Sequence, residues 1–142
     1  MWQRIQTLYL GIATALIASM FFCRFATIAG PDGAEEAILY YEKMPFLVLL
    51  IMLLTSHIAA VASYRSFFLQ ARVSAIAGLL ALGFQIWIAA DCIRYREVMS
   101  FSISALFPLA ATFLDLISAK KSMVDELTVQ TVRGIRKSRK RK

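Results

Sequence analysis

The chain has 142 residues, of which 59% are hydrophobic, and its 16 Lys and Arg residues outnumber 9 Asp and Glu residues to give a formal net charge of +7. Soluble domains use about 45–50% apolar residues, and a mean hydropathy of +0.64 is more than a water-soluble core of this length can bury. The composition therefore excludes an ordinary soluble domain and indicates an integral membrane protein.

Four long uncharged runs are the predicted membrane spans. They hold 19, 21, 18 and 17 residues between successive charged positions, and a helix needs roughly 17–25 residues to cross a hydrocarbon core. The predicted spans are about 5–23, 45–64, 73–90 and 98–117. The expected fold is all-α, an integral membrane four-helix bundle in residues 1–119 followed by an amphipathic to polybasic cytoplasmic tail in 120–142.

The first run has a second interpretation as a secretory signal, because Thr27-Ile28-Ala29 loosely resembles a cleavage site. Signal sequences have an apolar region of roughly 7–15 residues, which is shorter than this run of 19. Arg24 also follows the run directly, as it does at the end of a spanning helix. We therefore favour a span.

The loop after the first run is predicted to contain a turn and a short helix. Gly30-Pro31-Asp32-Gly33 is a turn pattern, and residues 34–41 are expected to form a helix on the membrane surface. Trp2, Tyr40 and Tyr41 are expected at the lipid boundary. The other two loops have only about eight and seven residues, which makes the last three helices antiparallel neighbours.

The distribution of basic residues predicts the orientation. If both termini are cytoplasmic, twelve of the sixteen Lys and Arg residues lie on the inner side, as the positive-inside rule requires. The first loop contains Asp32, Glu35, Glu36 and Glu42 and is net acidic, which suits the periplasm. The predicted location is the bacterial inner (cytoplasmic) membrane, with the chain crossing it several times.

The tail combines an amphipathic pattern with a basic end. Met123, Val124, Leu127, Val132 and Ile135 recur at roughly helical spacing. The predicted contact residues are Arg133, Arg136, Lys137, Arg139, Lys140, Arg141 and Lys142. We expect them to contact anionic lipid head groups or an acidic protein surface. Ribosomal RNA is a less favoured partner, because no aromatic residue for base stacking follows Lys120.

His57, the only histidine, is the candidate intramembrane polar site, since an ionisable group inside a span is a functional candidate by default. The favoured alternative is a neutral imidazole that bonds to Ser56 or to a backbone carbonyl. A single histidine excludes a bis-histidine haem site. The sequence contains no phosphate-binding loop, metal-ligand cluster or nucleophile beside a base, so neither enzymatic activity nor a cofactor is expected.

Other polar residues near the predicted span ends are expected to be structural. Cys23 and Cys92 should lie near the outer face as unbridged thiols, although a disulfide could persist there. Asp91 is expected to form a solvated i,i+3 pair with Arg94. Asp115 is expected at the opposite interface, where a carboxylate requires no functional explanation.

The N-terminal decapeptide Met-Trp-Gln-Arg-Ile-Gln-Thr-Leu-Tyr-Leu resembles the opening of a family of uncharacterised small four-helix inner-membrane proteins of Bacteroidetes, a domain of unknown function. Residues 119–127 and 132–136 are similar to the charged end of that family's fourth helix. The resemblance extends over the whole chain and implies the fold and the compartment. It implies no activity, because the family has none assigned.

These features favour a non-enzymatic inner-membrane protein, an accessory or assembly subunit of a larger membrane complex with its basic tail as the contact surface. A small transporter or channel is the alternative, for which the sequence reveals no polar pathway. Small proton-coupled exporters of similar size carry a carboxylate inside the first span, and residues 5–23 contain none. The expected partners are membrane lipids and other membrane proteins.

Overall fold

The computed structural model of the chain describes residues 3–30 and 33–139, with side chains for 5–30 and 33–137. Several residues discussed above lie outside the described residues: Trp2, Pro31, Asp32, Lys140, Arg141 and Lys142. The side chain of Arg139 is also outside them.

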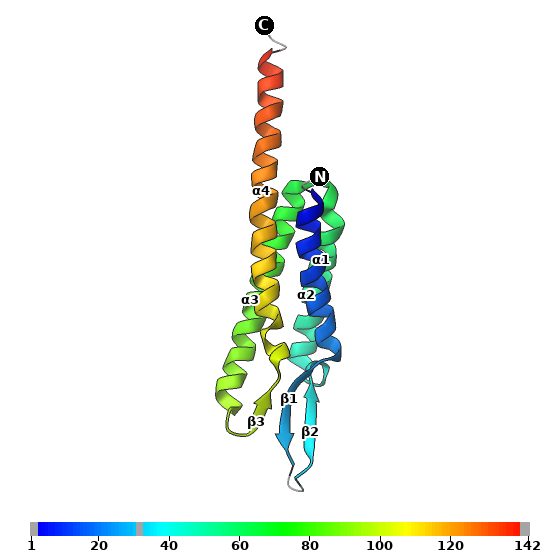
Figure 1. Cartoon of the computed structure of the whole chain (residues 1–142), viewed down its shortest axis with the longest axis vertical. Helices are drawn as coiled ribbons and strands as arrows, with labels where there is room; N and C mark the ends of the chain where they lie inside the picture. The colour runs from blue at the N-terminus through cyan, green and yellow to red at the C-terminus, as the bar shows by residue number, and fades with distance from the viewer. Residues whose placement is uncertain (1–2, 31–32, 140–142) are drawn as a thin grey trace.

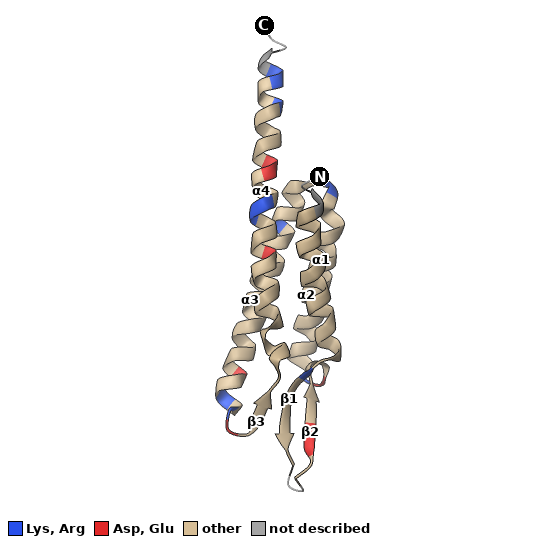
Figure 2. Cartoon of the chain, in the orientation of Figure 1, with Lys and Arg blue, Asp and Glu red and all other residues tan. Residues whose placement is uncertain are grey.

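Four long helices form the body of the molecule (Figure 1): α1 Gln3–Ser19, α2 Met44–Ala62, α3 Phe67–Tyr95 and α4 Phe107–Arg139. Each belongs to a segment long and apolar enough to cross a membrane. Charged residues gather at the two ends of the bundle and on the projecting part of α4 (Figure 2). The prediction of four candidate spans in a multi-pass membrane protein is confirmed.

One end of the bundle carries a three-stranded antiparallel sheet, with β1 Arg24–Ala29 between β2 Glu35–Leu39 and β3 Met99–Phe101. Next to the turn that joins β1 to β2, Gly33 has a φ of 75°, a conformation that favours glycine. The Gly30 amide donates to the Ala34 carbonyl at 2.8 Å beside it.

The sheet corrects two expectations. The fold is mostly helical rather than all-α, and the short helix expected at residues 34–41 is wrong, because this segment forms β2 and a short 3-10 turn, Tyr40–Glu42. Pairing with β1 supplies partners for the backbone groups of β2. The β-branched and aromatic side chains of β1 also suit a strand.

The same sheet shifts the start of the fourth helix. Strand β3 and the 3-10 turn Ile103–Leu106 occupy the beginning of the predicted span 98–117, so α4 begins only at Phe107. The helix then continues without a break to Arg139 and projects beyond the other three helices (Figure 1). The described part of the tail is therefore a continuation of α4.

An aromatic cluster joins the sheet to the bundle. Phe25 of β1 meets the rings of Tyr40, Phe46 and Phe101 nearly edge-on, at centroid distances of 5.3, 5.2 and 5.5 Å. Edge-to-face pairs of this kind stabilise a packed core. Cys23 and Cys92 are free, half-buried thiols that pack against the hydrophobic core to which this cluster belongs.

Lys43 lies over this cluster and pairs with α3. Its Nζ is 4.6 Å from the centre of the Phe25 ring and 3.1 Å from Asp91 Oδ2. The expected pairing of Asp91 with Arg94 is therefore not what the structure shows. The chain that leaves β2 places Lys43 at the start of α2, within reach of Asp91, which the local sequence around Asp91 does not indicate.

Candidate functional site

Polar side chains buried within the apolar bundle form the candidate site. Each of the following is at most 1% exposed: Gln6 of α1, His57 of α2, Gln70 and Ser74 of α3, and Asp115, Ser118 and Ser122 of α4. A buried polar group is costly unless it has a partner. Their contacts form two groups, one around His57 and Asp115 and one around Gln6.

His57 and Asp115 face each other across the bundle, with His57 Nε2 3.0 Å from Asp115 Oδ2 and both side chains fully buried. The other ring nitrogen, Nδ1, donates to the Leu53 carbonyl at 2.7 Å. A carbonyl only accepts, so Nδ1 carries a hydrogen and Nε2 faces the carboxyl group. A proton shared at this contact would reside either on Nε2 or on the carboxyl group, and the pair would be neutral overall in both forms.

The Asp115 carboxyl group keeps unused hydrogen-bonding capacity. Its contact with His57 is at an ion-pair distance rather than a regular hydrogen bond, and neither Oδ1 nor Oδ2 has a hydrogen-bond partner in the described part of the chain. The Nε2 atom of Gln70 is likewise without one there. Unsatisfied buried groups are rare in proteins and mark sites that require an explanation.

Close packing of α3 against α4 fixes the position of Asp115. The Ser74 hydroxyl donates to the Asp115 carbonyl at 2.9 Å. One turn later, a Cβ added to Gly78 would lie only 3.2 Å from Asp115 Cβ. A glycine therefore permits this approach, as small residues do at helix contacts in membranes.

The second group ties α1 to α4. The side-chain amide of Gln6 donates to Asp125 Oδ2 and accepts from the Ser122 hydroxyl at 2.8 Å. The Ser118 hydroxyl donates to the Gln6 backbone carbonyl at 3.4 Å. Both polar atoms of the Gln6 side chain, Nε2 and Oε1, thus have partners on α4.

The sequence indicated His57 but not its partner. Asp115, expected at the membrane interface, is fully buried within the bundle and faces His57. Its position at the end of an uncharged run predicts the interface, whereas α4 continues far beyond it and places it about 12 Å from the start of the helix. Ser56 is not the partner of His57, since its hydroxyl donates to the Met52 carbonyl at 2.8 Å.

The predicted contact residues of the tail lie apart from this site. Arg133, Arg136 and Lys137 are exposed on the projecting part of α4. Across the described residues, no group of three or more His, Cys, Asp or Glu side chains could hold a metal ion.

The family model described as "Domain of unknown function (DUF4293)" matches residues 2–133. No curated protein and no solved structure matches the chain.

Proposed function

The chain belongs to this family of unknown function, which covers most of its length, and from that premise we propose that it is a non-enzymatic accessory protein of a larger membrane complex. It resides in the bacterial inner membrane with both termini in the cytoplasm. The projecting part of α4 is its contact surface for a partner protein. The accessory role, the compartment and the orientation are all part of the proposal.

One observation carries this proposal: an apolar stripe on the projecting part of α4. The stripe consists of Leu127, Thr128, Thr131, Val132 and Ile135. Its three large apolar members are 63%, 59% and 64% exposed. These positions share one face of a helix, and an exposed face of this kind is typically covered by another amphipathic helix.

The charges around the stripe indicate the chemistry of the partner. From Leu127 onward α4 contains Arg133, Arg136, Lys137 and Arg139 but no acidic residue. The same segment of a second copy would bring like charges together, whereas a helix with acidic flanks would pair with them. The helix also projects beyond the other three helices (Figure 1), so no other helix of the bundle covers the stripe. The proposed partner is therefore a protein with an acidic amphipathic helix.

Site-specific cross-linking in cells tests this contact. A photoreactive residue at Thr131 lies in the stripe, whereas one at Gln130 lies on the opposite face, where Gln130 bonds to Glu126. We expect a protein adduct from position 131 alone, and its loss when Arg136→Glu and Lys137→Glu are combined. Equal adducts from both positions, or adducts only to lipid or to ribosomal RNA, would overturn the proposal.

Reporter fusions test the orientation independently. A periplasm-active reporter should function after Gly33 and should be silent after Lys142. Activity of the C-terminal fusion in the periplasm would place the contact surface on the wrong side for a cytoplasmic partner.

A small transporter is the second candidate function, because the buried His57–Asp115 pair is of the kind that carries protons in transporters. Proteoliposomes that contain a pH-sensitive dye can distinguish the two. Proton uptake that requires the protein and is lost in Asp115→Asn would favour the transporter. Proton uptake no faster than that of vesicles without protein would favour the accessory role.

A further inference from the structure

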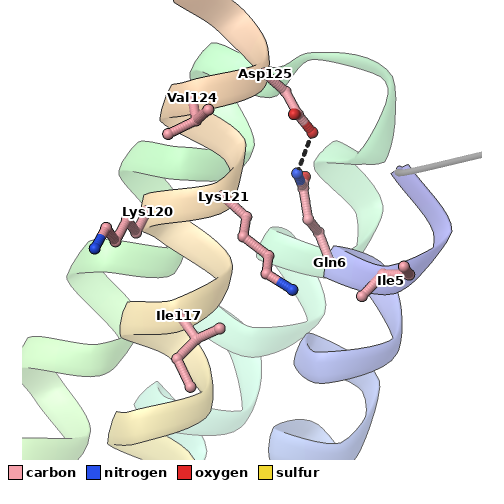
Figure 3. A pocket seen from close by; sticks show the side chains of 7 residues that line it. All are labelled: Ile5, Gln6, Ile117, Lys120, Lys121, Val124 and Asp125. Atoms are coloured by element: carbon pink, nitrogen blue, oxygen red, sulfur yellow. Dashed lines mark hydrogen bonds between the residues drawn. The ribbon is translucent and has the colours of Figure 1, made fainter.

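A groove of about 430 Å³ lies between α1 and α4, at the level where α4 leaves the bundle (Figure 3). Seven residues line it: Ile5, Gln6, Ile117, Lys120, Lys121, Val124 and Asp125. Ile5, Ile117 and Val124 form apolar walls, and they are 40%, 43% and 54% exposed. The groove therefore combines an apolar surface with two lysines and one carboxylate.

Lys121 lacks the partner that its helix would normally supply. Lys121 and Asp125 are four residues apart, a spacing that favours a salt bridge on a helix. Asp125 instead accepts the hydrogen bond of the Gln6 amide. In Figure 3 the Asp125 side chain points toward Gln6, whereas that of Lys121 extends across the groove toward α1.

Lys121 consequently forms no ion pair with a described residue. Among the described residues the ion pairs are Lys43–Asp91 and His57–Asp115, and neither involves this lysine or Lys120. Its Nζ lies 4.8 Å from the centre of the Tyr9 ring, which holds the half-buried side chain over α1. A fixed, unpaired cation in such a place is suited to an anionic ligand.

The position of the groove relative to the membrane identifies that ligand. The candidate span of α1 begins at Ile5, and Lys120 is the first basic residue after the apolar part of α4. If the hydrocarbon-embedded part of α4 ends at its first basic residue, Lys120, the apolar walls meet the lysines at the boundary between hydrocarbon and head groups. Basic pockets between spanning helices at this depth bind anionic lipid head groups.

We propose that this groove binds an anionic phospholipid. Its phosphate contacts Lys121, with Lys120 adding positive charge at the rim, and its acyl chain lies against Ile117 and Ile5. Free phosphate has no acyl chain to fill the apolar part of the groove, so a phospholipid fits the groove better than phosphate alone. The site is distinct from the α4 stripe and does not depend on the proposed partner protein.

Thermal stability of the purified full-length protein in neutral detergent tests the proposal. Added phosphatidylglycerol should raise the melting temperature in a saturable way, while phosphatidylcholine and inorganic phosphate should have little effect. Lys121→Gln should raise the apparent dissociation constant for phosphatidylglycerol about fivefold, the loss expected for one lysine near an anionic surface. Lys121→Arg should retain the affinity, and Arg96→Gln, an exposed position after α3 at the sheet end of the bundle, should leave it unchanged.

A second variant tests the role of Gln6. Gln6→Leu removes the hydrogen bond that holds Asp125, so Asp125 becomes free to pair with Lys121 and the affinity should fall although no groove charge has changed. Equal responses to phosphatidylglycerol and phosphatidylcholine, or an unchanged affinity in Lys121→Gln, would overturn the proposal. A response to inorganic phosphate as large as that to phosphatidylglycerol would also overturn it.

Discussion

The two ends of the bundle are held together in different ways. At the sheet end, Phe25 meets three other rings and Lys43 lies over it, so each side chain has several partners. At the other end, His57 faces Asp115 and Gln6 reaches Asp125, and these contacts involve few, specific partners. Redundant apolar packing tolerates change, whereas a buried polar group that loses its partner retains its full desolvation cost.

This difference indicates which contacts specify the arrangement of the helices. Apolar contacts between helices gain little in lipid, because the surroundings are equally apolar, so polar contacts and small residues determine which helices associate. The Ser74 and Gly78 face of α3 positions Asp115. At this end, polar contacts link α2 and α3 to α4 through Asp115 and link α1 to α4 through Gln6.

The largest expected effect comes from removing one member of the buried pair. Asp115→Leu leaves His57 buried without its partner, and breaking a buried pair in this way costs about 3–5 kcal/mol. The free energy of unfolding in mixed micelles would measure this loss.

The double variant His57→Leu, Asp115→Leu provides the matched control. Replacing both polar groups by apolar ones removes the unpaired group, so most of the lost stability should return. A double variant as unstable as the single one would mean that the two side chains stabilise the bundle by their packing and not by their polar contact.

A smaller effect is expected at the sheet end. Phe25→Leu keeps an apolar side chain in place but removes three edge-to-face ring contacts, each worth about 0.5–1.5 kcal/mol in other proteins. Because the remaining side chains can repack, we expect a loss of about 2 kcal/mol in the same assay. A loss larger than that of Asp115→Leu would reverse the comparison between the two ends.

The helices could be predicted from the sequence, because a hydrocarbon core demands long uncharged runs and each run is visible locally. The sheet could not be predicted in this way. Strand β1 pairs with β3 about seventy residues further along the chain, and neither strand shows a long alternating pattern. The pairing becomes favourable only when the helices bring these segments to the same end of the bundle.

The candidate site was predictable only in part for the same reason. His57 lies within an apolar run, which indicates a buried polar group, whereas Asp115 lies at the edge of such a run, which predicts the interface. Its burial depends on where α4 begins, and that depends on β3. The exposure of the apolar stripe on α4 likewise follows from the length of α4 relative to the other helices, which composition alone does not give.

The smallest expected effect on stability comes from the Tyr40 hydroxyl at the sheet end. The dependence of this effect on pH distinguishes it from a loss of packing. Burial raises the pKa of Tyr40 to about 12, and a hydrogen bond with the Ser104 hydroxyl opposes this shift. The two oxygens are 3.2 Å apart, and Ser104 also donates to the Arg24 carbonyl at 2.8 Å. Tyr40→Phe should therefore cost only about 1 kcal/mol at pH 8, since Ser104 retains a partner.

Above pH 10 the order of the two proteins should change. The unfolded chain ionises Tyr40 near pH 10, whereas the folded chain resists ionisation until about pH 12. The stability contributed by the neutral hydroxyl is thus fully present below pH 10 and is lost as the pH rises toward 12. A shift of this size corresponds to about 2–3 kcal/mol. Tyr40→Phe has no such group to ionise, so its free energy of unfolding should decline less steeply over that range. Parallel profiles of unfolding free energy against pH for the two proteins would show that Tyr40 is not shielded from solvent as the structure places it.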